Sequence, residues 1–247
     1  MRKLSPTKAI SHAFTSLVTY RAAAVHIGMV WVPILFALGV IQMLVGQPDP
    51  QALELNAAAF VQIASAAVSF IAFSSMAVSW HRFILRDEMG SPLRLDAPVL
   101  RYAGNSLLIM LMALVPLVTG LVLVLLLPFI SILLLPVSLM VAVAVTRLSL
   151  KLPAVALGRA DFSFKDAWAS SADNLWQLLG VFLLNAAIVF GILFMLVLVL
   201  SGIGQISPAA AKAVEVVVDA MLKLFLTLFN ASIFTSLYGF FVERRDF

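Results

Sequence analysis

Charged residues are absent from the longest apolar stretch of this sequence, which covers residues 106–146. The nearest charges are Arg101 before it and Arg147 after it. One membrane crossing needs roughly 20 apolar residues, so this stretch is too long for one span and suits two. Pro128 lies near its middle, where a tight turn would fall. We therefore predict a helical hairpin whose two spans cover residues 106–127 and 129–146.

Further apolar segments lie on both sides of this hairpin. They predict spans at about residues 22–45, 57–80 and 178–200, and a last span from about residue 222 inside a helix covering residues 208–242. In the first of these spans, Pro33 is expected to cause a kink. The whole pattern predicts an all-α membrane protein with six transmembrane helices, arranged as three hairpins in a single polytopic domain of residues 1–247.

Three shorter segments repeat apolar residues at helical spacing, and each begins with a possible cap: Ser5, Asp96 and Ser163. The third also fits the capping-box spacing and is predicted to continue as one helix to residue 179. We predict that these amphipathic helices lie at the cytoplasmic membrane interface, where His81 also falls at headgroup level. The aromatic interfacial candidates are Phe14, Trp80, Trp168 and Trp176. Two alternatives stay open, because the first helix could pack on other segments and the third could dock on a protein surface.

The same three segments suggest a weak internal repeat. Each unit would contain a capped amphipathic helix, a span, a connection and a second span. The units would cover residues 1–86, 87–155 and 156–247. Repeats in membrane proteins often show only faint sequence similarity. Chance similarity is the competing explanation, because the unit lengths differ.

Small and polar side chains inside the spans predict where helices meet. The stripe on the second span contains Ser65, Ser69, Ala72 and Ser79. Small residues let helix backbones approach closely, so this stripe is a candidate packing face. A polar transport path is the sharper interpretation of the serines, although hydroxyls that face a neighbouring helix are commoner. In the last two spans, Asn185 and Asn230 are predicted to face protein and are candidates to bond each other.

Composition agrees with the membrane assignment, and the charges predict its orientation. Apolar residues make up 63% and charged residues 11% of the chain, against about 45–50% and about 25% in soluble domains. Of the 16 Lys and Arg, 14 fall on the predicted near side and only Lys212 and Lys223 on the far side. Loops rich in Lys and Arg stay in the cytoplasm, so both termini are predicted to be cytoplasmic. Asp219 and Lys223 have the spacing of a helical ion pair, and their membrane depth is left open.

Three short stretches resemble a known family: Trp80-His81-Arg82-Phe83-Ile84-Leu85, Arg147-Leu148-Ser149-Leu150-Lys151-Leu152-Pro153-Ala154 and Asp166-Ala167-Trp168. They look like uncharacterised bacterial multi-pass inner-membrane proteins that are similar to the membrane domain attached to some glycerophosphodiester phosphodiesterases. The resemblance covers most of the chain through short motifs. It implies a multi-helix domain in the bacterial inner (plasma) membrane with amphipathic segments on the cytoplasmic face. It carries over no activity, because no catalytic positions can be matched.

Side chains that commonly carry chemistry are sparse. The chain has no Cys, and His12, His26 and His81 fall in different segments without metal-ligand spacing. No nucleophile elbow or phosphate-binding glycine loop is present. We therefore expect no metal or cofactor and a non-enzymatic scaffold or accessory subunit of a membrane complex. The alternative is a transporter or lipid-handling protein, which a polar cavity between hairpins would favour. The expected partners are membrane lipids, with other membrane-protein subunits as further candidates and no nucleic acid.

Overall fold

Helices dominate the part of the chain that the structure describes, and no strand occurs there. The computed structural model describes residues 3–46, 56–159 and 161–245. Five helical segments are long and apolar enough to cross a membrane, and one bent pair of helices would make a sixth. The five are α4 (Ala57–Arg86), α5 (Ala97–Leu126), Ser131–Ala156, α9 (Leu175–Ile206) and α10 (Pro208–Phe241). The arrangement is that of an all-helical, multi-pass membrane protein.

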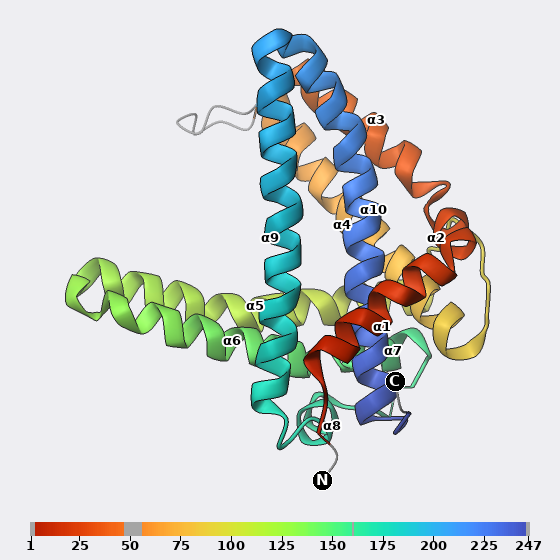
Figure 1. Ribbon diagram of the computed structural model, residues 1–247, viewed down its shortest axis with the longest axis vertical. Coiled ribbons are helices and arrows are strands. Elements are labelled where there is room, and N and C mark those ends of the chain that lie inside the picture. The colour runs from red at the N-terminus through yellow and green to blue at the C-terminus, as the bar shows by residue number, and fades with distance from the viewer. Residues whose placement is uncertain (1–2, 47–55, 160, 246–247) are drawn as a thin grey trace.

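Helix α10 is the centre of the molecule. It packs against α1 (Pro6–Thr19), α3 (Trp31–Val45), α4 and α9, and its C-terminal half is almost completely buried. Figure 1 shows α9 and α10 side by side along the longest axis. The glycines of the first span allow close packing on α10, because a Cβ at Gly28 would lie 2.7 Å from Leu224 Cδ2.

The predicted first span is bent between two helices. Helix α2 (Arg21–Gly28) ends before Met29, and α3 starts at Trp31 at an angle of 51° to it. Pro33 has no N–H to bond the carbonyl of Met29, four residues earlier, and its ring crowds that carbonyl. The break therefore lies one turn before the proline that was predicted to cause it.

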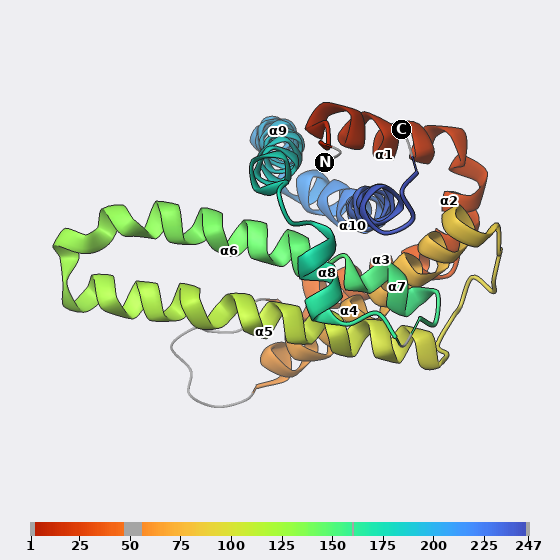
Figure 2. The same cartoon turned by 90° about the horizontal axis from the view of Figure 1, so that it is seen from below.

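The central hairpin forms as predicted and projects from the rest of the molecule. Helix α5 ends at Leu126, the 3₁₀ helix η1 (Pro128–Leu133) makes the turn, and α6 (Leu134–Leu148) returns. Figures 1 and 2 both show the outer part of this hairpin without a neighbouring helix. Its large apolar side chains are therefore exposed on the protein surface, as in Val115 and Leu125. Such a surface suits hydrocarbon and not water.

The three predicted caps are all present, but the helices that follow them differ from the prediction. Ser5, Asp96 and Ser163 each accept a hydrogen bond from the backbone N–H three residues later. Ser163 and Asp166 form the reciprocal capping box. The segment after Asp96 is simply the first part of α5 and no separate helix. The caps agree with the repeat units but do not test them, so the repeat stays a prediction.

The predicted single helix over residues 163–179 is wrong. It consists of α8 (Phe164–Ser170), a turn, and the start of α9 at Leu175. Asp173 in the turn has a φ of 64°, which lies in the left-handed region. The N-terminal segment fastens this turn, because the Leu4 N–H donates to Asn174 Oδ1 at 3.0 Å and Lys3 Nζ to the Asp173 carbonyl at 2.7 Å. These contacts link positions 170 residues apart, so local periodicity could not predict them.

Helix α1 packs across α9 and α10 through its small and apolar face. Ala9, Ile10, Ala13 and Ser16 are buried in that contact region. Protein packing, which was the open alternative for this helix, therefore accounts for the buried part of its apolar stripe. Phe14 lies on the other side of the helix with 53% of its surface exposed.

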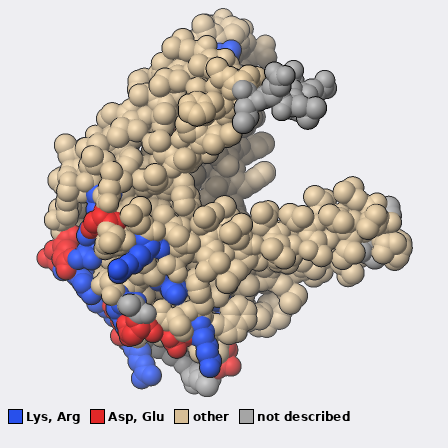
Figure 3. Space-filling view, turned by 180° about the vertical axis from the view of Figure 1, so that it is seen from behind, with Lys and Arg blue, Asp and Glu red and all other residues tan. Residues whose placement is uncertain are grey.

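Charged residues gather at one end of the molecule. Figure 3 shows blue and red side chains concentrated at the corner from which the two arms of the molecule extend, with a mostly uncharged surface elsewhere on that face. Both ends of the chain lie at the same end of the α9–α10 hairpin (Figure 1). This separation agrees with an even number of membrane crossings. We refer to the charged end as the charged face.

Candidate polar groove along helix α10

One stripe of α10 is polar over most of its length, although the helix is otherwise apolar. The side chains of this stripe are Lys212, Glu215, Asp219, Lys223, Thr227 and Asn230. They recur every three or four residues, which places them on one face of the helix. A polar stripe inside an apolar helix is expected to face a partner or a cavity and not lipid.

A polar cavity of about 610 Å³ opens between α3, α4 and α10, near the turn at Ser207; we call it the outer cavity. The stripe contributes all four of its charged side chains to the lining. Polar side chains of α3 and α4 complete it: Gln42, Gln62, Ser65 and Ser69. Hydrogen bonding inside the cavity is incomplete. Gln42 Nε2 donates to Gln62 Oε1 at 3.2 Å, whereas the buried Ser65 Oγ has no partner among the described residues.

The outer cavity also contains an ion pair. Lys223 Nζ lies 2.7 Å from Asp219 Oδ2, and both side chains are about two-fifths exposed. The two residues are 16 and 12 positions beyond Ser207, which places them level with about Gly191 and Met195 of the antiparallel α9. That part of α9 is continuously apolar. The ion pair therefore lies beside a segment of α9 that is apolar enough to cross a membrane.

Two more cavities continue along the same face of α10. The middle cavity, about 260 Å³, shares Ser69 and Lys223 with the outer one and is otherwise mainly apolar. The inner cavity, about 450 Å³, shares Asn230 with the middle one and lies between the α5–α6 hairpin and α9–α10. Figure 3 shows the molecule hollowed between its two arms. Neighbouring cavities share these lining residues, and we call the three together the α10 groove.

The predicted asparagine pair lies in this groove. Asn185 Nδ2 of α9 donates to Asn230 Oδ1 of α10 at 3.0 Å, and Asn230 Nδ2 donates to the Leu226 carbonyl at 2.8 Å. Both residues line the inner cavity. The expectation that they contact protein and bond each other is confirmed. The buried Asn185 Oδ1 has no partner within the described parts of the chain, so the cavity still contains an unused acceptor.

The small-residue stripe of α4 has two different environments. Ala72 and Ser79 are buried in protein, as expected for a packing face. Ser65 and Ser69 instead border the outer cavity, where Ser69 also reaches the middle one. The sequence allowed two interpretations of this stripe, helix packing or a polar path. The structure shows packing at one end of the stripe and a cavity at the other.

Trp80 and His81 face protein and not lipid headgroups, contrary to prediction. Both are fully buried. Trp80 Nε1 donates to Ser232 Oγ at 2.7 Å, and His81 Nδ1 lies 2.7 Å from Thr235 Oγ1. The Thr235 hydroxyl already donates to a backbone carbonyl, so His81 Nδ1 carries the proton and donates to it. These pairs hold α4 against α10.

The other aromatic candidates are more exposed. Trp176 has 76% of its surface exposed, and Trp168 has 45%. One face of the Trp168 ring is covered by Arg147, whose guanidinium carbon lies 3.8 Å from the ring centre. Contact of Phe14, Trp168 and Trp176 with a membrane stays a prediction.

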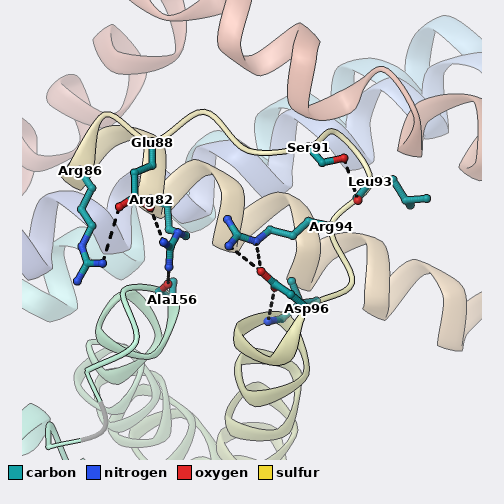
Figure 4. Close-up of polar contacts among 9 residues, drawn as sticks. Arg82, Arg86, Glu88, Ser91, Leu93, Arg94, Asp96 and Ala156 are labelled. Carbon is teal, nitrogen blue, oxygen red and sulfur yellow. Dashed lines mark hydrogen bonds and ion pairs between the residues drawn. The ribbon is translucent and has the colours of Figure 1, made fainter.

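The loop after α4 forms a second polar cluster, on the charged face. Figure 4 shows Arg82 pointing to Glu88 and to the carbonyl of Ala156, at 3.1 Å from the latter. Arg94 binds Asp96 at 2.7 Å. Partial burial acts to raise the pKa of Asp96, but the hydrogen bond and charge of Arg94 lower it overall. This cluster joins the loop to α4 and to the end of α7 (Lys151–Ala156), which is a structural role.

The groove contains two residues for which the sequence analysis predicted no role. Gln42 and Gln62 received no role, although isolated amides inside two apolar spans were a usable signal. The described residues include no group of three or more His, Asp or Glu arranged to hold a metal ion. Comparison of the chain with protein-family models, with curated proteins and with solved structures finds no match.

Proposed function

We propose that this protein is a lipid-handling membrane protein. The polar headgroup of a membrane lipid enters the α10 groove, while the acyl chains stay in the surrounding bilayer. The observation that carries this proposal is the polar stripe of α10, which lines linked cavities beside apolar helices. A polar cavity between hairpins is also the feature that distinguishes this function from a solid scaffold.

The chemistry of the groove suits passive passage of a headgroup. Moving a charged or polar headgroup through hydrocarbon is costly, because its hydrogen bonds with water are lost. The stripe offers charged and amide groups at successive turns of α10, from Lys212 to Asn230, that replace part of this hydration. We propose movement down a concentration gradient and no chemical conversion of the lipid.

We place the protein in the bacterial inner membrane with both termini in the cytoplasm. The distribution of Lys and Arg supports the orientation, and the resemblance of Trp80–Leu85 and neighbouring motifs supports the location. In this orientation the outer cavity faces the non-cytoplasmic leaflet, and the inner cavity lies nearer the charged face.

A liposome assay tests the proposal. The purified chain is reconstituted into vesicles that contain a trace of acyl-labelled fluorescent phospholipid, and a membrane-impermeant reductant is added outside. Protein-free vesicles should lose about half of the signal, the outer-leaflet share, whereas active protein should expose nearly all of it. Equal loss with and without the wild-type protein contradicts the proposal.

A blocking variant connects the activity to the groove. Ser69→Phe fills the junction of the outer and middle cavities, so it should slow lipid movement severalfold or more. Ala67→Phe is the matched control, because Ala67 lies two residues away on an exposed part of α4. Equal rates for the two variants, at similar thermal stability, would place lipid movement outside the groove.

A scaffold or accessory subunit is the second candidate, favoured by the free α5–α6 hairpin. The outer part of this arm contacts only itself among the described residues and exposes large apolar side chains. A photoreactive residue at Leu125 separates the two functions in cells. A discrete protein adduct favours a scaffold, and lipid adducts alone favour the lipid-handling proposal.

A further inference from the structure

We infer that the outer cavity selects a zwitterionic headgroup with a primary amine, of the phosphoethanolamine class. This inference rests on the proposed function and specifies the lipid that the α10 groove accepts. It is carried by the arrangement of acids and bases in the cavity, by an unpartnered buried hydroxyl, and by the apolar space that continues from the polar one.

The charges of the outer cavity balance. Lys212 and Lys223 provide two positive charges, and Glu215 and Asp219 provide two negative ones. An anionic headgroup would add a negative charge to a cavity whose two lysines are already balanced by two carboxylates, and like charges at short range repel. A headgroup that carries one charge of each sign meets a complementary group for both. The cavity therefore fits a zwitterion better than an anionic lipid.

The ion pair shows how the two charges could be received. Lys223 and Asp219 are one helical turn apart and bind each other at 2.7 Å. A phosphate binds Lys223, and a neighbouring ammonium binds Asp219, with Glu215 one turn further along the same stripe. Each charge of the protein pair then exchanges its partner for the matching charge of the ligand. Neither member of the Lys223–Asp219 pair is left unpaired by this exchange.

The acids also favour a primary amine over a quaternary one. An ammonium group has three N–H donors that a carboxylate can accept, as in lysine. A trimethylammonium group has none and is usually bound by aromatic rings. The described residues that line the outer cavity include no aromatic side chain. A choline headgroup would therefore gain only a weak, non-directional attraction to Asp219 and Glu215.

Ser65 is an independent indication that the cavity receives a polar ligand. The residue is 96% buried and borders the cavity, and its Oγ has no hydrogen-bond partner in the described segments. Leaving a buried hydroxyl unpaired is unfavourable, so such groups usually have a partner in the working state. A phosphate oxygen near Lys223 would accept this hydrogen bond.

The middle cavity indicates that the zwitterion is part of a lipid. It adjoins the outer cavity at Ser69 and Lys223, and most of its other lining is apolar, including Leu35, Phe73 and Met76. A soluble phosphoethanolamine would fill only the polar part. A lipid can place its headgroup at Lys223 and its glycerol and first methylene groups in the adjoining apolar space.

Direct binding to the purified full chain tests the inference. Acyl-labelled phosphatidylethanolamine, phosphatidylcholine and phosphatidylglycerol are titrated against the protein in a mild non-ionic detergent. Phosphatidylethanolamine should bind about tenfold more tightly than either of the others, since a charged hydrogen bond contributes on this order. Glycerophosphoethanolamine, which has no acyl chains, should compete only at much higher concentration. Competition at equal concentration would overturn the lipid assignment and favour a soluble zwitterion.

Charge-removing variants assign the preference to residues. Asp219→Asn and Glu215→Gln should reduce the preference for phosphatidylethanolamine over phosphatidylcholine, whereas Lys223→Gln should weaken both lipids. Asp161→Asn and Lys165→Gln are matched controls on the charged face, outside the groove. The Glu215 variant guards against misfolding, because Glu215 is exposed on α10. Thermal unfolding of each variant is measured alongside.

The outcomes separate this inference from the proposed function. Equal binding of all three lipids by the wild type overturns the headgroup selectivity. If Ser69→Phe still slows lipid movement in that case, the groove function stands and only the selectivity fails. If the wild type moves no lipid in vesicles, the proposed function fails. An unchanged preference in both Asp219→Asn and Glu215→Gln also overturns the assignment of the amine site.

Discussion

Two hydroxyl groups of α10 each accept a hydrogen bond from a ring N–H of α4. Ser232 Oγ donates to the Leu228 carbonyl at 2.8 Å and accepts from Trp80, while Thr235 acts in the same way toward Ala231 and His81. His81 Nε2 is then left to accept from the Tyr102 hydroxyl, at 3.3 Å. Each hydroxyl thus uses its proton locally and its lone pair across the helix interface. Lipid tails are as apolar as helix surfaces, so apolar contacts alone favour helix association only weakly in a membrane. Hydrogen bonds between helices add to this stability.

Replacing either member of the Asn185–Asn230 pair by Leu should lower the thermal stability in detergent modestly. A hydrogen bond between membrane helices contributes about 0.6 kcal/mol on average and up to about 1.7 kcal/mol. Melting of the wild type, the two single variants and the double variant measures the coupling. If both single variants melt like the wild type, the bond adds no stability.

Acidic pH should weaken the attachment of α1. His12 Nδ1 lies 2.8 Å from Ser236 Oγ, and burial lowers the pKa of His12 below its ordinary value of 6.5. A base with a lower pKa in the folded state binds its proton more readily after unfolding. Stability should therefore fall as the pH drops below about 6.5. We expect a lower melting temperature at pH 5.5 than at pH 7.5, and a smaller difference in His12→Asn. An equal difference in this variant would assign the effect to other groups.

Helices α2 and α3 pack closely against α10 at two glycines, one in each helix. Gly28 lies against Leu224, and a Cβ at Gly39 would lie 2.9 Å from Val216 Cγ1. The absence of a side chain brings the first span near enough to α10 to form one wall of the outer cavity. The same two glycines therefore determine how closely the helices pack and where the wall of the groove lies.

Gly28→Val should destabilise the protein, because its Cβ alone would lie 2.7 Å and 2.9 Å from the two methyl carbons of Leu224. Overpacking of this kind costs about 1–3 kcal/mol. Gly104→Val is the matched control, since nothing lies within 4 Å of a Cβ at Gly104. Thermal unfolding in detergent should show a clear drop for the first variant and none for the second, because valine is a better helix former than glycine. Similar losses would mean that the drop does not come from the contact with Leu224.

The whole molecule consists of two apolar arms that extend from the charged face. The arm of α9, α10, α3 and α4 carries the groove, and the α5–α6 hairpin forms the other arm (Figures 1 and 3). A single bilayer must contain both, so at least one arm is tilted in the membrane. The space between the arms then opens sideways to lipid, which is the direction from which a lipid headgroup would enter.

Cysteine labelling checks this arrangement, because the chain has no native cysteine. Ser207→Cys and Phe129→Cys mark the tips of the two arms, and Glu88→Cys and Asp161→Cys mark the charged face. A membrane-impermeant maleimide should label both tips from outside the cell and the charged face only after permeabilisation. Labelling of Phe129→Cys from the cytoplasmic side only would contradict a shared direction of the arms. The order of the spans also predicts a far-side loop near Asp49, which lies outside the described residues.

Features that depend on neighbouring residues in the sequence could be predicted. The lengths of the apolar runs indicated the spans, because a bilayer requires helices of a minimum length. Ser5, Asp96 and Ser163 were recognisable as caps, since a cap acts on an N–H three residues away. Pro128 marked the turn of the central hairpin for an equally local reason. The bond between Asn185 and Asn230 was also within reach, because few partners exist for an amide inside an apolar span.

Features that depend on contacts between distant segments required the tertiary structure. An aromatic residue at the end of a span suits an interface, yet Trp80 is buried because Ser232 of α10 lies opposite it. The helix over residues 163–179 is interrupted because Leu4 and Lys3 bind its turn. The groove exists only because α3, α4 and α10 meet at the polar stripe. Hydrophobicity assigns a segment to the membrane, but it does not distinguish lipid from protein as its neighbour, so only tertiary packing decided which polar residues share a cavity.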